Sequence, residues 1–360
     1  MPKNSNSFDP DAPADADAGI FGLTLPPGEA RVQLLGVPFD ATTSYRQGTA
    51  HGPRAIFAAS HQVDLFDPQQ ATWGDGDGRP WKAGLFYEED QEIARWNGEA
   101  GELSEPIIAC GGQITGNSEL EAALERVNEI GALVNERVRA WTAAKLSDGA
   151  LPVLVGGDHS IPFGGIQAAA QAAGSLGILH FDAHADLRPA YEGFRWSHAS
   201  IMWNVLKEIP QVERIVSVGL RDIGEGESRA IERSEGRIQA TFAHEWARAR
   251  AKGQDLEQLA AKAIDALPQN VWLSIDIDGL DPSWCPNTGT PVPGGLTWDE
   301  LLLWLGCLAN SGKRVVGLDL SEVNPGPATL ADQDSWDAIV GARLLYKAIG
   351  AALGSVKRQD

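Results

Sequence analysis

The chain has 360 residues, of which 43% are hydrophobic and 22% charged, the usual proportions of a globular protein. With 29 basic and 49 acidic side chains, its formal net charge is −20. This charge makes nucleic acid and anionic membrane surfaces poor partners and favours a small cationic substrate, although acidic surfaces mostly serve solubility.

The three cysteines lack metal-type spacing, which argues against a disulfide framework. The start of the chain lacks the basic and apolar regions of a secretory signal, and no apolar run reaches the length of a membrane helix. We therefore expect a soluble cytoplasmic protein.

The first part of the chain, residues 1–30, is rich in Asp, Ala, Pro, Asn and Ser, and we predict a flexible N-terminal extension there. From residue 31 to 360, apolar runs alternate with amphipathic segments, which predicts a single domain. The expected strands are Val32–Phe39, Pro152–Gly157, Leu176–Asp182, Arg214–Leu220, Val271–Asp278 and Arg314–Leu320. The expected helices are Glu119–Leu146, Ile161–Ala173, Ala199–Glu208, Leu256–Leu267, Trp298–Ala309 and Trp336–Leu353.

Near-continuous apolar strands are typical of parallel sheets that are buried on both faces. Strands that alternate with helices predict an α/β fold, a three-layer α/β/α sandwich with a central parallel sheet. The stretch 71–116 departs from this pattern, because Trp73, Trp81 and Trp96 stand among many glycines and acids. We predict a long loop insertion there, whose aromatics line a substrate entrance or, as we favour, pack onto the body.

Three short clusters of acids and histidines each follow an expected strand. They are Gly156–Ser160, Asp182–Asp186 and Asp276–Pro282. In an open parallel sheet the ligand crevice lies outside the carboxyl ends of the strands. Several of these acids are two residues apart, and in an extended backbone that spacing points side chains to one face. The alternatives are Asp-rich turns in solvent and an ordinary hydrogen-bonded loop histidine.

So many acids are costly to bury without a counter-charge, so we predict two divalent cations about 3.5–4 Å apart. The predicted metal ligands are His159, Asp182, His184, Asp186, Asp276 and Asp278. A donor set of carboxylate and imidazole without thiolate suits Mn²⁺, while Ni²⁺, Co²⁺ and Fe²⁺ stay open. We assign the remaining histidines to packing or to ordinary loop roles: His51, His61, His180 and His244.

These clusters resemble the three signature motifs of the ureohydrolases, the arginase and agmatinase superfamily, with the third motif extending over Ser274–Pro282. Other segments along the chain are also typical of that family, in the same order. They are Thr43–Thr49, Gly52–Ile56, Thr288–Pro291, Gly294–Thr297 and Asp319–Pro325. The resemblance runs from about Val32 to the end of the chain and implies an arginase-like fold.

The resemblance also implies roles for individual residues. Asp182 and Asp276 would bridge two metals, and a water activated between them would attack a guanidinium carbon, releasing urea and an amine. Asp186 and His198 would transfer protons, and the ordinary histidine pKa of about 6.5 suits that task. Glu322 would bind the guanidinium through paired hydrogen bonds. Otherwise His198 is a plain helix-start histidine and Glu322 a surface acid.

The segment Leu187–Arg195 departs from the arginase pattern and resembles one branch of agmatinases. Arg188 would meet a carboxylated guanidine at the mouth or would pair with Glu192 instead. Thr290 would orient a site carboxylate or serve a turn. With Glu322, these three residues are our candidate substrate-binding set.

The leading hypothesis is a metal-dependent amidinohydrolase of polyamine metabolism that cleaves agmatine to putrescine and urea. Within the class, guanidine, guanidinobutyrate, arginine and formiminoglutamate stay open as substrates. A non-catalytic metal-loaded binding or regulatory subunit is the alternative from another class. Because relatives form trimers or hexamers, we expect a homo-oligomer.

Overall fold

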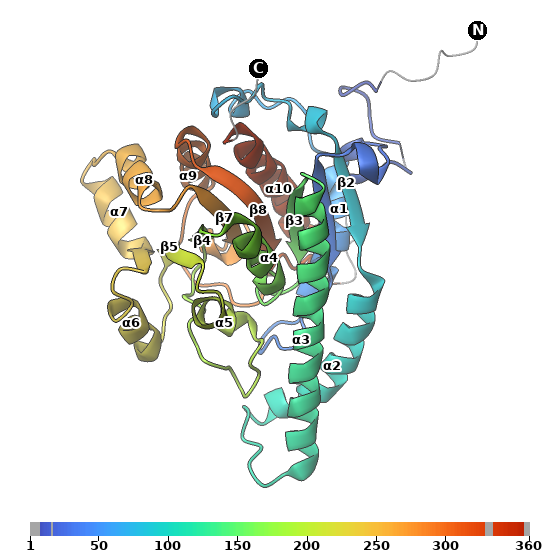
Figure 1. Cartoon of the computed structure of the whole chain (residues 1–360), viewed down its shortest axis with the longest axis vertical. Coiled ribbons are helices and arrows are strands. Elements are labelled where there is room, and N and C mark those ends of the chain that lie inside the picture. Colours follow the sequence, from blue (N-terminus) through green and yellow to red (C-terminus); the bar gives the residue numbers. More distant parts are fainter. Residues whose placement is uncertain (1–7, 16, 328–333, 356–360) are drawn as a thin grey trace.

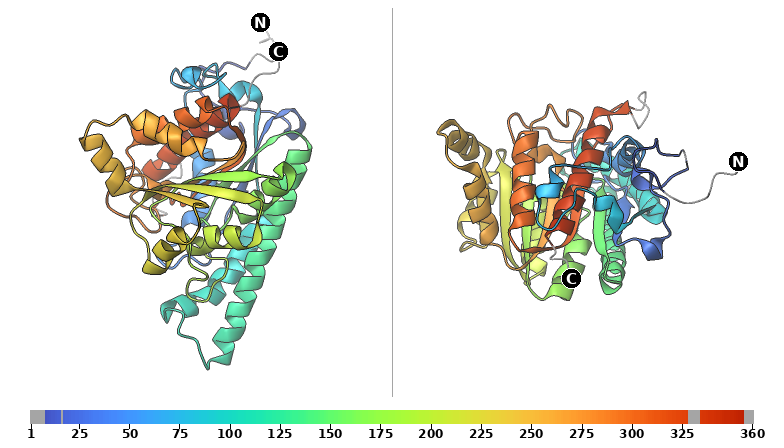
Figure 2. Two further views of the ribbon diagram at one scale, coloured as in Figure 1. Left: turned by 60° about the vertical axis from the view of Figure 1, so that its left-hand side comes forward. Right: turned by 90° about the horizontal axis from the view of Figure 1, so that it is seen from above.

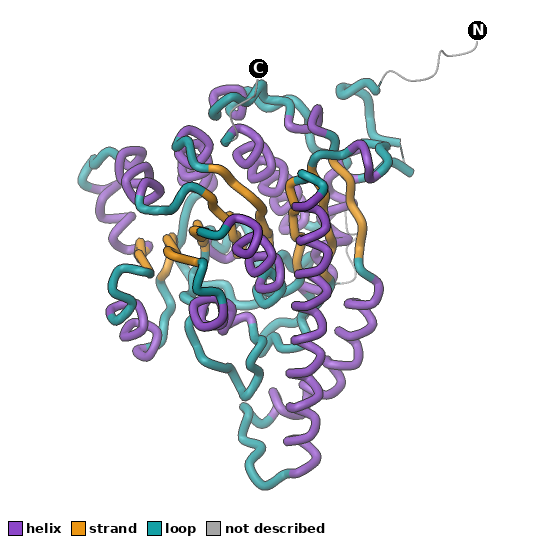
Figure 3. Tube along the Cα trace, in the orientation of Figure 1, coloured by secondary structure: helices purple, strands orange, loops and turns teal. Residues whose placement is uncertain are grey.

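One eight-stranded parallel sheet runs through the molecule, in a computed structural model that describes residues 8–15, 17–327 and 334–355. Figure 3 shows the strands at the centre, with helices around them. The strands are β1 Val32–Val37, β2 Leu85–Glu89, β3 Leu151–Gly156, β4 Leu176–Phe181, β5 Val212–Leu220, β6 Ile238–Phe242, β7 Asn270–Asp276 and β8 Arg314–Ser321. Their order in the sheet is β2-β1-β3-β8-β7-β4-β5-β6, and every pairing is parallel.

Helices cover both faces of this sheet (Figures 1 and 2). They are α1 Gly52–Ser60, α2 Gln91–Ala109, α3 Ser118–Ser147, α4 Phe163–Ala173, α5 Ile201–Glu208, α6 Glu225–Glu232, α7 Ala243–Ala251, α8 Leu256–Asp265, α9 Trp298–Asn310 and α10 Trp336–Gly354. One buried cluster joins the sheet to α1 and α7–α10, and the other joins it to α2–α5. The predicted three-layer α/β/α sandwich is confirmed.

The two clusters follow from the alternation of side chains along a strand. In β1, Leu34 packs into the cluster with α1 and α10, whereas Leu35 packs into the cluster with α2 and α3. Successive side chains point to opposite faces of a sheet, so a strand that is apolar at every position serves both layers.

The prediction of a long loop at 71–116 is wrong. This stretch contains the edge strand β2 and the 19-residue helix α2, which begins at the N-cap Asp90. The sequence did not predict this helix because its interior contains Pro106 and two glycines, which have low helix propensity. Its buried residues Ile93, Ala100 and Ile107 nevertheless recur at helical spacing.

The tryptophans of this stretch pack onto the body, as we favoured. Trp73 is buried in the core, and Trp81 and Trp96 are partly buried against the two clusters. They therefore stabilise the layers that surround the sheet.

The prediction of a loose extension at 1–30 is also wrong for the residues nearest the sheet. Ile20 and Phe21 are buried, the Phe21 amide donates to Ser60 Oγ (2.9 Å), and the Phe21 ring centroid lies 4.9 Å from that of Tyr346. This segment therefore docks on α1 and α10 because it carries apolar side chains among its polar ones. Residues 1–7 and 16 lie outside the described part of the chain.

Across the described ranges, no helix combines the length and the apolar character needed to cross a bilayer.

Candidate metal and substrate site

Four strands that lie next to one another deliver the acidic clusters to one place. β3, β8, β7 and β4 are consecutive in the sheet, and all run in the same direction. His159 follows β3, Glu322 follows β8, Asp276 ends β7 and Asp182 follows β4. Their side chains therefore meet at the carboxyl edge of the sheet, where open parallel sheets bind ligands.

The local backbone is turned at this edge, and the extended geometry that we predicted from the two-residue spacing is wrong. Asp182 Oδ1 accepts the amide of His184 (2.6 Å), and Asp186 has a φ of 53°. Asp276 Oδ1 likewise accepts the amide of Asp278 (2.8 Å) at the start of a 3-10 turn. Short Asp side chains favour such turns because they bond to a backbone amide two residues ahead.

The turns gather the first group of predicted ligands around His159, which is 1% exposed. Its Nδ1 lies 3.1 Å from Asp182 Oδ2, 2.9 Å from Asp186 Oδ2 and 3.7 Å from Asp276 Oδ2. The other ring nitrogen, Nε2, is 2.9 Å from Ser274 Oγ, which itself donates to a buried acid, Asp319 (3.0 Å). Because the hydroxyl proton of Ser274 is used there, Nε2 donates to Ser274, and Nδ1 faces the three carboxylates.

A second group surrounds His184. Its Nδ1 is 3.1 Å from Asp278 Oδ2 and 3.4 Å from Asp182 Oδ1. Asp278 is oriented by the Ala183 amide on Oδ1 (2.9 Å) and by the Thr290 hydroxyl on Oδ2 (3.3 Å). Asp182 belongs to both groups, with one carboxylate oxygen toward each histidine. The six predicted ligands therefore form two adjoining sets of donors.

Carboxylates outnumber imidazoles among the six predicted ligands, so their charge favours divalent cations. Burial, and then the neighbouring acids, raise the pKa of Asp276 well above its ordinary value and that of Asp186 to about 8. Burial opposes the charged form of His159, yet hydrogen bonds to Asp182 and Asp186 outweigh it and raise the His159 pKa. Carboxylate and imidazole donors with this need for positive charge suit a pair of divalent metal ions.

His180 is a site residue that the sequence reasoning missed. It is fully buried in β4, as expected of a core residue, but its Nε2 lies 2.9 Å from Asp182 Oδ2 and its Nδ1 lies 3.2 Å from Ser217 Oγ. The signal was its position two residues before Asp182, on the same face of the strand. His180 therefore orients the carboxylate that both groups share.

Glu322 and His198 lie beside the cluster. Glu322 is 1% exposed, has a φ of 63° and accepts the His159 amide on Oε1 (3.0 Å). Its Oε2 is buried without a hydrogen-bond partner among the described residues, and so is Nε2 of His198. His198 Nδ1 is 3.6 Å from Glu322 Oε1. Burial, and then the charge of His184, lower the pKa of His198 to about 4, so it does not keep the ordinary value that suggested proton transfer.

A cavity of about 200 Å³ opens beside these groups. Its lining residues are Ser44, His184, Asp186, Arg188, Tyr191, His198, Ala199, Asp222, Glu227, Asp276 and Thr290. The predicted alternative pair of Arg188 with Glu192 is absent: Arg188 Nε lies 3.7 Å from Glu227 Oε2, and its guanidinium lies over the Tyr191 ring. Glu192 and Glu322, two of the candidate substrate-binding residues, do not line the cavity.

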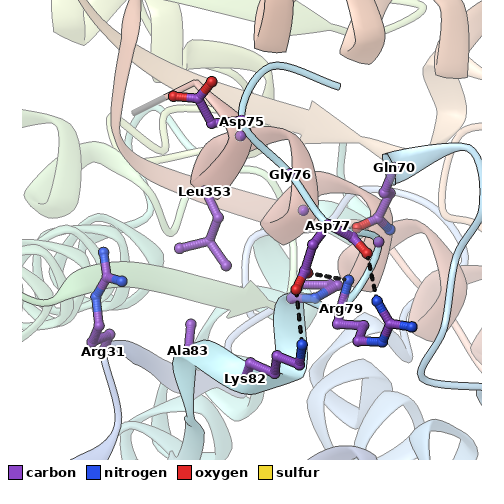
Figure 4. Close-up of a pocket in the computed structure, with 13 residues that line it drawn as sticks. Arg31, Gln70, Asp75, Gly76, Asp77, Arg79, Lys82, Ala83 and Leu353 are labelled. Atoms are coloured by element: carbon purple, nitrogen blue, oxygen red, sulfur yellow. Dashed lines mark hydrogen bonds and ion pairs between the residues drawn. The ribbon is translucent and has the colours of Figure 1, made fainter. Parts of the chain in front are cut away.

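A larger cavity, of about 770 Å³ (Figure 4), lies near the amino ends of β1 and β2. Its walls include Arg31, just before β1, and Leu353 in α10. Lys82 and Asp77 form an ion pair across it (2.9 Å), and none of the clustered acids lines it. We therefore place the functional site in the smaller cavity.

The fold and this donor set are those of a ureohydrolase, and comparison with known proteins agrees. The chain belongs to the arginase family, whose sequence model matches residues 30–350. It is 31% identical to the N(1)-aminopropylagmatine ureohydrolase of Thermus thermophilus over 92% of this chain and 94% of that protein. It is 28% identical to the agmatinase of Pyrococcus horikoshii over 92% of this chain and 96% of that protein.

The fold is likewise that of solved ureohydrolase structures. The proclavaminate amidino hydrolase of Streptomyces clavuligerus superposes with a TM-score of 0.67 at 23% identity, over 92% of this chain and 94% of that chain. The chain is therefore a metal-dependent amidinohydrolase of the agmatinase and ureohydrolase type. Enzymes of this family use a binuclear divalent metal centre, and this chain brings together two groups of His and Asp side chains that could hold metal ions.

Proposed function

We propose that this enzyme hydrolyses agmatine to putrescine and urea. The observation that carries the proposal is Oε2 of Glu322, a buried carboxylate oxygen without a hydrogen-bond partner in the described part of the chain. A guanidinium presents parallel N–H groups that match a carboxylate, and it carries the charge that a buried acid needs. Glu322 would therefore bind and orient the planar guanidinium beside the metal ligands.

The walls of the cavity support an amine on the far end of the substrate. The positive charge of Arg188 is balanced by the neighbouring carboxylate of Glu227. The exposed Asp222, which also lines the cavity, has no ion pair or hydrogen bond to its carboxylate among the residues described. One uncompensated negative charge at the mouth favours a primary ammonium over a carboxylate. The alternatives with a carboxylated tail, guanidinobutyrate and arginine, would meet repulsion there.

The proposed metal ligands are His159, Asp182, His184, Asp186, Asp276 and Asp278. Two divalent cations bound by these side chains, with Mn²⁺ the leading candidate, would supply positive charge and lower the pKa of a water so that it attacks near neutral pH. Thr290 would hold Asp278 in place. Asp186, which lines the cavity, would pass a proton to the departing amine, whereas the lowered pKa of His198 removes the basis for giving it that role.

The test is a urea-release assay on purified enzyme loaded separately with Mn²⁺, Ni²⁺ and Co²⁺. The panel contains agmatine, aminopropylagmatine, arginine, guanidinobutyrate, formiminoglutamate and guanidine. We expect the highest kcat/KM with agmatine. If no compound releases urea, the hydrolytic proposal fails, and if guanidine or guanidinobutyrate is turned over fastest, the agmatine assignment fails.

The substitution Asp222→Asn tests how the amine is recognised. Because Asp222 is exposed, its charge is screened, and we expect KM for agmatine to rise only about two- to fivefold. The matched control is Glu105→Gln, an exposed acid on α2 that does not line the cavity. An equal rise in KM for uncharged-tail guanidines in Asp222→Asn would contradict an electrostatic role.

A further inference from the structure

We propose that helices α2 and α3 position the two loops that wall the substrate cavity, through the carboxamides of Asn97 and Asn128. This inference rests on the proposed function for its link to substrate. It assigns a role to α2, the helix within the stretch 71–116 that the sequence did not predict.

Asn97 in α2 holds the loop that follows β1. Its Oδ1 accepts the backbone amide of Asp40 (2.8 Å), and its Nδ2 donates to Asp40 Oδ1 (3.1 Å). The other oxygen of Asp40 accepts the amides of Gly48 (2.8 Å) and Ala50 (3.1 Å), so Asp40 closes the loop from inside. A second residue of α2, Ser104, donates its hydroxyl to the backbone of the same loop.

This first loop forms part of the substrate cavity. Ser44 lines the cavity, and Thr43 donates to Asp158 (3.3 Å), the residue before the metal ligand His159. The loop also approaches Glu322, since a Cβ on Gly289 would lie 3.2 Å from Glu322 Oε2 and 3.5 Å from the carbonyl oxygen of Tyr45. A change at Asn97 would therefore shift groups that contact substrate, although Asn97 does not line the cavity.

Asn128 in α3 holds the second loop in the same way. Its Oδ1 accepts the backbone amide of Arg195 (2.8 Å), and its Nδ2 donates to the carbonyl of Gly193 (3.3 Å). The turn between α2 and α3 touches this loop as well: a Cβ on Gly112 would lie 2.8 Å from Glu192 Cα. Figure 1 shows that turn beside the loop that precedes α5.

The second loop carries two residues of the opposite cavity wall, Arg188 and Tyr191. The Tyr191 ring packs edge-on against His198, with centroids 6.4 Å apart. Each helix thus contributes one carboxamide that both donates to and accepts from a loop, which fixes its position and direction more closely than apolar contact does. The two helices also pack on each other within one apolar cluster. Both loops are therefore attached to the same pair of helices.

The experiment compares Asn97→Ala, Asn128→Ala and Glu105→Ala in the metal-loaded enzyme. For both asparagine variants we expect KM for agmatine to rise roughly fivefold or more, with a smaller change in kcat and unchanged metal content, because substrate placement is sensitive to small displacements. Glu105→Ala, on the exposed side of α2, should leave both constants unchanged.

Amide hydrogen exchange gives a readout that does not depend on turnover. Asn97→Ala should speed exchange at Gly48 and Ala50 and leave Arg195 unchanged, and Asn128→Ala should do the reverse. Faster exchange throughout the chain, or no local change, would overturn the positioning role. Local change with unaltered KM would separate the loops from substrate binding and also overturn it. If the wild-type enzyme released no urea, the proposed function would fail, while the exchange pattern would still decide whether the helices hold the loops.

Discussion

The substitution Glu322→Gln separates guanidinium binding from the rest of the site. The amide has nearly the same shape, and its oxygen can still accept the His159 amide, which Glu322 Oε1 accepts at 3.0 Å. What is lost is the negative charge and the acceptor at the unpartnered Oε2. The variant therefore tests the one interaction on which the proposed function depends.

The expected loss follows from the burial of this carboxylate. A hydrogen bond to a charged group contributes about 1.5–3 kcal/mol, and two are lost or weakened, so we expect about 3–4 kcal/mol. That corresponds to a fall of roughly 10²–10³-fold in kcat/KM. In the free enzyme, by contrast, the negative charge of Glu322 is unfavourable. Burial, and then the charge of Asp158, raise the pKa of Glu322, so its ionised form is costly without substrate. The variant should therefore unfold at the same temperature as the wild type or higher.

The assay measures urea release and thermal unfolding on the same metal-loaded samples, with metal content determined in parallel. The control is Glu105→Gln, which removes an exposed negative charge far from the cluster. A fall in kcat/KM of less than about fivefold, with metal content retained, would refute the reasoning, because exposed charges already give effects of that size. A lower unfolding temperature would show that the carboxylate stabilises the fold instead.

Three further outcomes follow from buried groups. His180→Leu should weaken metal binding about 10–100-fold, measured by competition with a chelator, because it removes the hydrogen bond that orients Asp182; an unchanged affinity would contradict that role. Burial raises the pKa of the Cys285 thiol, so iodoacetamide at pH 8 should alkylate the exposed Cys110 and spare Cys285 in the folded protein, which intact mass spectrometry checks. Gly157→Ala should lower the free energy of unfolding by about 1–3 kcal/mol in denaturant melts, because its Cβ would lie 2.0 Å from the Phe39 carbonyl oxygen.

The strands that carry the site could be predicted from sequence because they are apolar at every position. β3, β4, β7 and β8 lie within two residues of the predicted bounds. α2 was missed because Gly98, Gly101 and Pro106 have low helix propensity and its buried apolar residues are widely spaced. α6, β6 and α7 were missed as well, since their segments have few buried residues and so a weak pattern.

The identity of the clustered acids and histidines could be predicted, but their partners could not. The contacts of His159 with Ser274 and of Asn97 with Asp40 join residues far apart in the chain, and no local pattern reports them. The side proposed to bind the substrate tail was harder still. Glu192 lies in the segment Leu187–Arg195, but its backbone packs on Gly112 and it does not line the cavity, whereas Asp222 lines the cavity from a segment after β5 with no predicted role. Loop side chains are directed by tertiary contacts, which a short motif does not specify.

The three clusters meet as we expected although their local geometry differs from the prediction, and the reason lies in the order of the strands. Two-residue spacing predicts extended backbone, yet Asp182 and Asp276 each bend the chain by accepting an amide two residues ahead. What brings the groups together is that β3, β8, β7 and β4 are neighbours in the sheet, although their order in the chain differs. A parallel sheet ends all its strands at one edge, so acids placed just after neighbouring strands converge whatever turn follows. The turn decides only which oxygen points inward, and at Asp182 it leaves one oxygen for each donor set.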